Sequence, residues 1–183
     1  MNRLLKNKIL LFQLSIRKDP ETFGKVYDEY INRIYRFIYF KVSREEEAQD
    51  LASETFLRAW QYIQEGKEIK QLGAFLYSIA RNLVIDHYRK KVLLVNAEDA
   101  DAAGNLTDGG AEKLKVEGAQ EYGALLSAMS KLKDEYKEMV QLRYIDELSV
   151  GEIAEVLGKN KGTVRVTLHR ASKTLREVLN QNK

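Results

Sequence analysis

The sequence predicts an all-α protein made of two small helical domains joined by a flexible acidic linker. Apolar residues recur at intervals of three and four along most of the 183-residue chain, which is the spacing of one helix face. Strand-like alternation is scarce, and the chain contains 1 proline. A stretch rich in Ala, Gly and acids separates two helical blocks, so we place the domains at residues 1–91 and 118–183 and the linker at residues 92–117.

The N-terminal block contains three predicted helices. The first begins at Asp19, which is followed by a proline and an acid, an order typical of a helix start. The second is expected to begin with a capping box between Ser43 and Glu46. The third is predicted over residues 74–90.

Composition excludes several classes of protein. The chain has no cysteine, which rules out disulfides and thiolate metal sites. No apolar run approaches the ~20 residues of a membrane span, and residues 10–12 are too short an apolar core for a signal peptide. His87 and His169 lie in different domains, outside any metal-binding frame. We therefore expect a cytoplasmic protein with no metal, no cofactor and no catalytic site.

The segment from residue 148 to residue 165 is the most informative part of the chain. Ser149 and Glu152 predict a capping box, and Gly158 can adopt the left-handed conformation that ends a short helix. Asn160 is a good N-cap for the longer helix that follows. A short helix, a turn with glycine and a longer basic helix are typical of a DNA-binding helix-turn-helix.

Charge is concentrated on this second helix. From Lys159 to the C-terminus seven Lys or Arg face one acid, a net charge of +6, whereas the whole chain carries +3. Such asymmetry favours a polyanion-binding surface over the alternative, an ordinary helical hairpin with solvated charges. In a DNA groove Arg165 is the expected base contact, and Val166 and Thr167 would meet a thymine methyl.

Two helix faces in the N-terminal block leave alternatives open. Glu47, Asp50, Glu54 and Arg58 lie away from the apolar face of the second predicted helix, which is either solvated or docks a helical partner. Tyr77, Arg81 and Tyr88 share a stripe of the third predicted helix. That stripe suits single-stranded bases, and it fits a salt-bridged amphipathic helix with partly buried tyrosines equally well.

Four short motifs follow one another along the chain. They are Gln49-Asp50-Leu51 through Trp60, Ile79-Ala80-Arg81-Asn82 with Ile85-Asp86, Leu142-Arg143-Tyr144 with Leu148-Ser149, and Gly162-Thr163-Val164 with Leu168-His169-Arg170-Ala171. In this order, with an acidic linker between two helical blocks, they resemble the extracytoplasmic-function (ECF) sigma factors of the sigma-70 family. These are compact promoter-recognition subunits of bacterial RNA polymerase. The resemblance covers about residues 20–91 and 118–180.

The resemblance implies a sigma region 2-like domain followed by a region 4-like domain. The second helix would dock on the clamp of the largest polymerase subunit through Asp50, Glu54, Arg58 and Trp60. The third helix and the loop before it, about residues 62–72, would melt the −10 promoter element and hold its bases, with Tyr77, Arg81, Asn82 and Arg89 as the contacting residues. The C-terminal domain would contact the polymerase flap and read the −35 duplex through Lys161, Gly162, Thr163, Arg165, Thr167, His169, Arg170 and Lys173.

The protein would then be a specificity subunit of RNA polymerase and not an enzyme. Its expected partners are the polymerase core and promoter DNA, with an anti-sigma factor as a further candidate and no membrane insertion. Val166, Thr167 and Ser172 depart from the family pattern, and Asp134 is expected to cap a helix where the family has proline. The alternative function is a stand-alone helix-turn-helix regulator that binds DNA without polymerase core.

Overall fold

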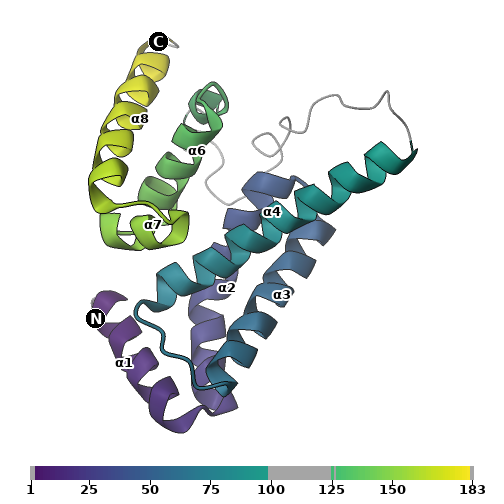
Figure 1. Ribbon diagram of the computed structural model, residues 1–183. Helices are drawn as coiled ribbons and strands as arrows, with labels where there is room; N and C mark the ends of the chain where they lie inside the picture. Colours follow the sequence, from purple (N-terminus) through teal and green to yellow (C-terminus); the bar gives the residue numbers. More distant parts are fainter. Residues whose placement is uncertain (1–2, 99–124, 126, 182–183) are drawn as a thin grey trace. The chain divides into compact units, whose positions relative to one another are not determined.

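The computed structural model describes residues 3–98, 125 and 127–181, and every regular element in these residues is helical. The elements are α1 (Arg3–Arg17), α2 (Pro20–Val42), α3 (Glu45–Gln64), α4 (Leu72–Glu98), α6 (Asp134–Val140), the π-helical turn η1 (Gln141–Ile145), α7 (Val150–Leu157) and α8 (Lys161–Gln181) (Figure 1). The all-α prediction is confirmed. The chain divides into two compact units between Gly110 and Ala111. Residues 99–117 of the predicted linker lie outside the described residues.

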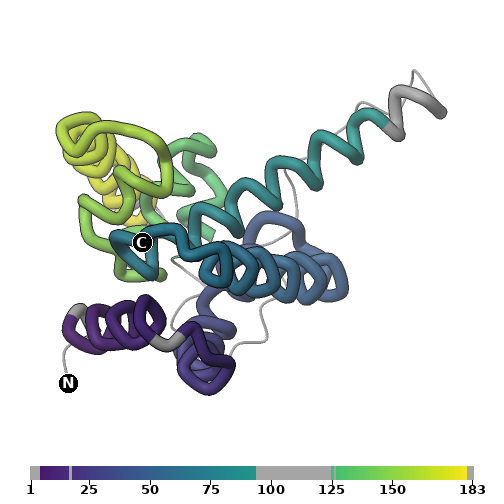
Figure 2. Tube along the Cα trace, turned by 60° about the horizontal axis from the view of Figure 1, so that its bottom comes forward, coloured from purple at the N-terminus to yellow at the C-terminus, as the bar shows by residue number. Residues whose placement is uncertain are grey.

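The N-terminal unit is built from α1 to α4. Helices α2, α3 and α4 contact one another, and α1 packs against α2 and α4 (Figures 1 and 2). The fully buried side chains of this core include Val26, Tyr30, Ile34, Phe37, Ile38, Leu72, Leu76 and Tyr77. Burying one large apolar side chain contributes roughly 1.5–3 kcal/mol, so this core holds the outward faces of α3 and α4 in fixed positions.

Helix α1 was not among the predicted helices. Its inner face buries Asn7, Leu10 and Leu14, with Leu10 5% and Leu14 2% exposed. This spacing is helical, but the segment has no acid in its first turn to mark a start. Among the described residues, no helix combines the length and apolar character needed to cross a membrane.

The junction between α2 and α3 differs from the predicted capping box. Ser43 ends α2 with a φ of 62°, and its backbone N–H donates to the Tyr39 carbonyl at 3.0 Å. A residue in this left-handed conformation lacks the extended backbone of an N-cap, so the box with Glu46 does not form. Arg44 takes the N-cap position of α3 without a side-chain hydrogen bond.

The start of α2 is confirmed, whereas α4 is longer than predicted. Asp19 Oδ1 accepts the N–H of Thr22 at 2.8 Å, with Pro20 as the first helical residue. Helix α4 extends the predicted 74–90 segment at both ends and enters the region assigned to the linker. No glycine or proline follows Gly73 until Gly104, so the sequence contains no strong helix breaker at residue 91.

The C-terminal unit places α7 and α8 in the predicted helix-turn-helix. Helix α7 packs against α8 and η1, and α6 packs against α8. The Ser149 N–H donates to Glu152 Oε2 at 2.8 Å and the Glu152 N–H to Ser149 Oγ at 3.3 Å, which confirms the capping box. Gly158 has a φ of 62°, as the turn requires.

The prediction that Asp134 caps α6 is wrong. Lys133 occupies the N-cap position and makes no side-chain cap hydrogen bond. Asp134 is the first helical residue and pairs with Lys137 at 3.3 Å. Its carboxylate therefore stabilises the first turn through the helix dipole and this ion pair.

Candidate functional sites

Helix α8 has a buried side and an exposed side. Val164, Leu168, Ala171 and Leu175 are buried, whereas Val178 is only partly buried. The residues on the opposite line of the helix follow at steps of three or four and are all exposed: Gly162, Val166, His169 and Lys173. This line would face any duplex that α8 contacts.

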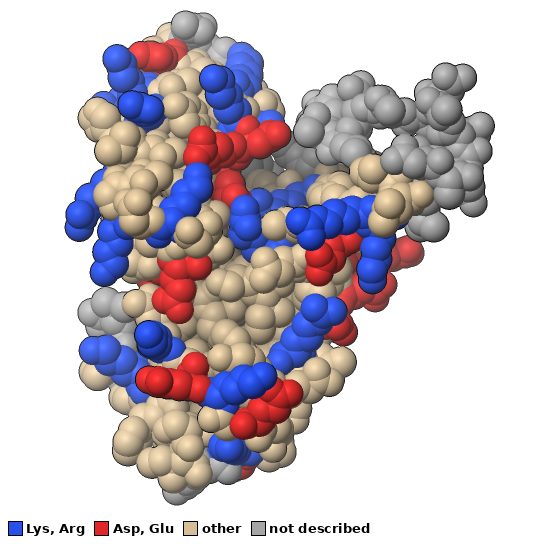
Figure 3. Space-filling model, in the orientation of Figure 1, with Lys and Arg blue, Asp and Glu red and all other residues tan. Residues whose placement is uncertain are grey.

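Cations lie on both flanks of that exposed line. Lys161 and Arg165 are on one side and Arg170 is on the other, all of them exposed. Within the described part of the chain, Arg165, Arg170 and Lys173 have no ion-pair partner, while Lys159 pairs with Glu135. Figure 3 shows Lys and Arg side chains over the part of the surface formed by α8. The helix therefore presents uncommitted positive charge.

The first turn of α8 is arranged around Asn160. Its Oδ1 accepts the Thr163 N–H at 2.8 Å and the Thr163 hydroxyl at 3.0 Å, which confirms the predicted N-cap. The Asn160 carbonyl accepts the Val164 N–H at 3.1 Å. A phosphate at this helix terminus would therefore meet the N–H groups of Lys161 and Gly162.

The prediction that Thr167 contacts DNA is wrong. Its side chain is 9% exposed, because it lies three residues after Val164 and four before Ala171, on the packed side of the helix. Val166 keeps the exposed position expected of it, with 51% of its surface accessible. The apolar contact available to a thymine methyl is thus reduced from two side chains to one.

Ser172 connects α8 to η1. Its hydroxyl lies 2.8 Å from the hydroxyl of Tyr144 in η1, and Tyr144 is 55% exposed. The surface where α8 meets η1 therefore presents two uncharged hydroxyl groups.

The outward side of α3 presents a charged group beside an aromatic one. Asp50 and Arg58 are exposed, and Glu54 Oε1 lies 2.7 Å from Arg58 Nε. Glu47 does not belong to this outward group. Its carboxylate lies 3.2 Å from His87 Nε2 and 3.9 Å from Lys91 Nζ, so it ties α3 to α4.

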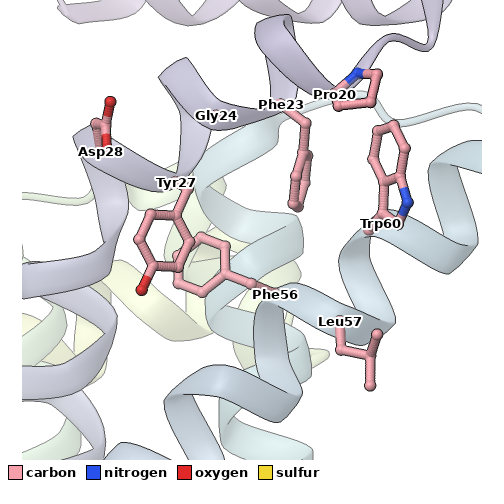
Figure 4. A pocket seen from close by; sticks show the side chains of 8 residues that line it. All are labelled: Pro20, Phe23, Gly24, Tyr27, Asp28, Phe56, Leu57 and Trp60. Carbon is pink, nitrogen blue, oxygen red and sulfur yellow. The ribbon is translucent and has the colours of Figure 1, made fainter.

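A groove of about 410 Å³ adjoins this charged group, between α2 and α3. It is lined by Pro20, Phe23, Gly24, Tyr27, Asp28, Phe56, Leu57 and Trp60 (Figure 4). The Trp60 and Phe23 rings are 5.0 Å apart, and those of Tyr27 and Phe56 are 4.8 Å apart. Leu57 is 51% exposed at its rim. The contribution of α2 was missed from the sequence, because Phe23 and Tyr27 share the spacing of its core positions.

The prediction that Tyr77 stacks on a base is wrong. Its side chain is fully buried, and its ring packs edge-on against Phe37 with centroids 5.1 Å apart. Arg81 is partly exposed, and Asn82 and Arg89 are exposed on α4, so the polar members of this predicted site remain at the surface. The inner side of α4 packs against α2, and Tyr77 lies on that side, so its ring is not available for stacking on a base.

Tyr88 is also partly withdrawn from the surface. Its hydroxyl donates to the Lys41 carbonyl, and burial, followed by the nearby Glu47 carboxylate, raises the pKa of its phenol. Both effects favour the neutral phenol. Tyr88 therefore acts as a contact between α2 and α4.

The exposed aromatic surface lies instead between the end of α3 and the start of α4, on the two sides of the loop that joins them. The rings of Tyr62 and Phe75 are 4.8 Å apart, and Lys67 Nζ lies 5.2 Å from the Tyr62 centroid. Both rings are partly exposed. The hydrogen bond from Lys67 to Glu65 raises the pKa of the Lys67 ammonium. A ring pair with a cation is suited to stacking on nucleobases.

Comparisons with known proteins match both units. The model of sigma-70 region 2 matches residues 26–92, and the model of sigma-70 region 4 matches residues 122–175. The chain is 32% identical to the ECF RNA polymerase sigma factor SigW of Bacillus subtilis, over 98% of each chain. It is 38% identical to the ECF RNA polymerase sigma factor BldN of Streptomyces coelicolor, over 88% of this chain and 61% of that relative's length.

A solved structure shows the same fold. It is a co-crystal of the sigma factor RpoE with the anti-sigma factor NepR from Bartonella quintana, 22% identical to this chain. The match has a TM-score of 0.66 and covers 88% of this chain and 98% of that one. The helix-turn-helix, the two family models and the similarity to SigW lead to one conclusion. The chain belongs to the ECF sigma factors of the sigma-70 family.

Proposed function

We propose that this sigma factor binds RNA polymerase core and directs it to promoters through two DNA-binding surfaces. Helix α8 reads the −35 element as duplex, and the α3–α4 loop with the outward side of α4 opens and holds the −10 element. The polymerase supplies the chemistry, so this chain is a specificity subunit that catalyses no step itself. It acts in the cytoplasm, where polymerase and promoter DNA meet.

The observation that carries this proposal is the exposed side of α8. A capped helix N-terminus, cations on both flanks and Val166 between them together provide phosphate contacts and direct base contacts. The uncharged pair of Ser172 and Tyr144 lies at one edge of this surface. Val166 is an exposed apolar side chain on this surface and can contact the methyl group of a thymine. We therefore expect a −35 preference that includes a thymine.

Binding to the −10 element is assigned to residues around the α3–α4 loop. Tyr62 and Phe75 offer partly exposed rings, and Lys67 lies over the Tyr62 ring. Asn82 and Arg89 on α4 offer exposed polar groups. Flipped or single-stranded bases gain about 1–3 kcal/mol each from stacking of this kind, which offsets the cost of unpairing them.

Polymerase docking is assigned to α3. Asp50, Glu54 and Arg58 would pair with a helical element of the clamp, and Trp60 with its groove would anchor it through apolar contact. The C-terminal unit would contact the flap. An anti-sigma factor is a further proposed partner, since the related RpoE is crystallised with one.

In vitro transcription with purified core tests the function. Core plus this protein should initiate from a subset of a promoter library, and core alone should not. The alternative, a stand-alone regulator, predicts tight binding of duplex DNA without core and no initiation. Copurification with core but no promoter selection would contradict the two DNA-binding assignments.

A further inference from the structure

Helix α1 has a second apolar face, opposite the one packed against α2 and α4. Its members are Leu5, Ile9, Phe12 and Ile16, which are 53%, 41%, 67% and 64% exposed. Steps of four, three and four residues place them on one side of the helix, about half a turn from the buried Leu10 and Leu14. These four side chains, named here the α1 stripe, therefore lie outside the core.

The α1 stripe is a continuous surface. Ile9, Phe12 and Ile16, together with Lys8 and Gln13, line a shallow open groove of about 490 Å³ on the surface of α1 itself. Exposed apolar side chains are normal when scattered singly, but a contiguous apolar patch with a polar rim marks an interaction site. The inner side of α1 is held by the core, so the stripe cannot be covered by turning the helix over.

The chemistry around the α1 stripe is cationic. Residues 1–18 contain five Lys or Arg and no acid. Lys8 is exposed at the edge of the groove, whereas Lys6 pairs with Glu29 of α2. A partner that covers the stripe must therefore combine apolar side chains with negative charge.

These features disfavour a second copy of the chain. Two α1 helices would bring like charges together at Lys8. An amphipathic helix with an apolar seam and acidic flanks meets both requirements, because its apolar side chains can pack along the stripe at the same helical spacing while its carboxylates reach Lys8.

We infer that the α1 stripe is a docking site for an acidic amphipathic helix of a partner protein. The apolar seam of that helix packs on Ile9, Phe12 and Ile16, and its carboxylates pair with Lys8. This surface shares no residue with the α3 docking residues or with either proposed DNA-binding surface. The inference therefore stands independently of the proposed function.

The test uses the full-length protein and a labelled, designed helical peptide of about five turns, with leucines along one seam and glutamates on both flanks. We expect saturable binding that weakens as salt is raised, because the flanking pairs are exposed. The double variant Phe12→Ser with Ile16→Ser should bind roughly tenfold more weakly or worse. Lys8→Glu should also weaken binding of this peptide.

Controls separate this occupant from others. Leu93→Ser, which alters an α4 side chain that is 68% exposed, should bind the peptide like the parent. A peptide with lysines in place of the glutamates should bind far more weakly to the parent and better to Lys8→Glu. Unchanged far-ultraviolet circular dichroism and melting of the double variant show that it folds.

Three results would overturn the inference. The first is equal binding of the acidic and basic peptides, or full binding by the double variant. The second is a parent dimer in sedimentation that the double variant abolishes, which assigns the stripe to a second copy. The third is flotation with phosphatidylglycerol vesicles in the absence of peptide binding, which assigns it to a lipid surface.

Discussion

Replacing Arg165 by alanine tests whether α8 reads a base pair. Arg165 lies one turn after Lys161, on the flank of the exposed line, and its side chain is exposed. No acidic side chain of the described residues pairs with it, so its removal breaks no ion pair in the folded protein. The free energy of unfolding should therefore change by no more than about 0.5 kcal/mol.

The expected loss appears in DNA binding. A bidentate contact from arginine to guanine is worth about 1–3 kcal/mol, which corresponds to roughly 5- to 150-fold in affinity. Arg165→Ala should lose this much on the preferred −35 sequence and little on a sequence already changed at that base pair. Lys173→Ala should weaken all sequences alike and reduce the salt slope by about one.

The assay is promoter binding by reconstituted holoenzyme on a series of −35 point variants at several salt concentrations. Double-variant logic applies: the protein change and the base-pair change should be non-additive at one position only. If Arg165→Ala keeps the base preference and alters only the salt slope, Arg165 is a phosphate contact. The proposed placement of Arg165 against a base pair would then be wrong.

Other positions give simpler tests. Tyr77→Ala should destabilise the N-terminal unit by about 3–5 kcal/mol in chemical denaturation, because it empties a buried ring site; a stable variant defective only in promoter opening would contradict this. Asp50→Lys with Glu54→Lys should weaken pull-down of polymerase core while helix content stays constant, with Glu155→Lys as a charge-reversal control outside α3. Asn160→Ala should cost about 1 kcal/mol of stability in the C-terminal unit, measured by thermal unfolding, and an unchanged melting temperature would argue against the cap.

The predicted helix ends that depend on neighbouring residues were mostly correct. Asp19, Ser149 with Glu152, Gly158 and Asn160 all adopt the predicted roles. Each cap is decided by side chains and backbone groups within about four residues of one another, so the local sequence contains the required information. The capping box predicted for Ser43 did not form, for a reason that is not local: α2 extends to Val42, so Ser43 is the C-cap of α2.

The assignment of side chains to surface or core was less predictable. Tyr77 and Thr167 both lie on helices that were correctly predicted, yet both face inward. A helix periodicity shows which residues share a face, but the packing partners decide how wide the buried face is. Helix α2 covers Tyr77, and the packed side of α8 is wide enough to include Thr167.

The sequence by itself determined the helical class, the helix-turn-helix with its caps, the positive charge of α8 and the resemblance to ECF sigma factors. These follow from short-range periodicity, capping chemistry and motif order. Only the tertiary structure decided that α1 packs through Leu10 and Leu14 and leaves the α1 stripe exposed. It also decided that Phe23 and Tyr27 join α3 in a groove, and that Tyr62 and Phe75 replace Tyr77 as candidate stacking residues. The physical reason is that exposure depends on contacts between helices far apart in the chain, which no local pattern specifies.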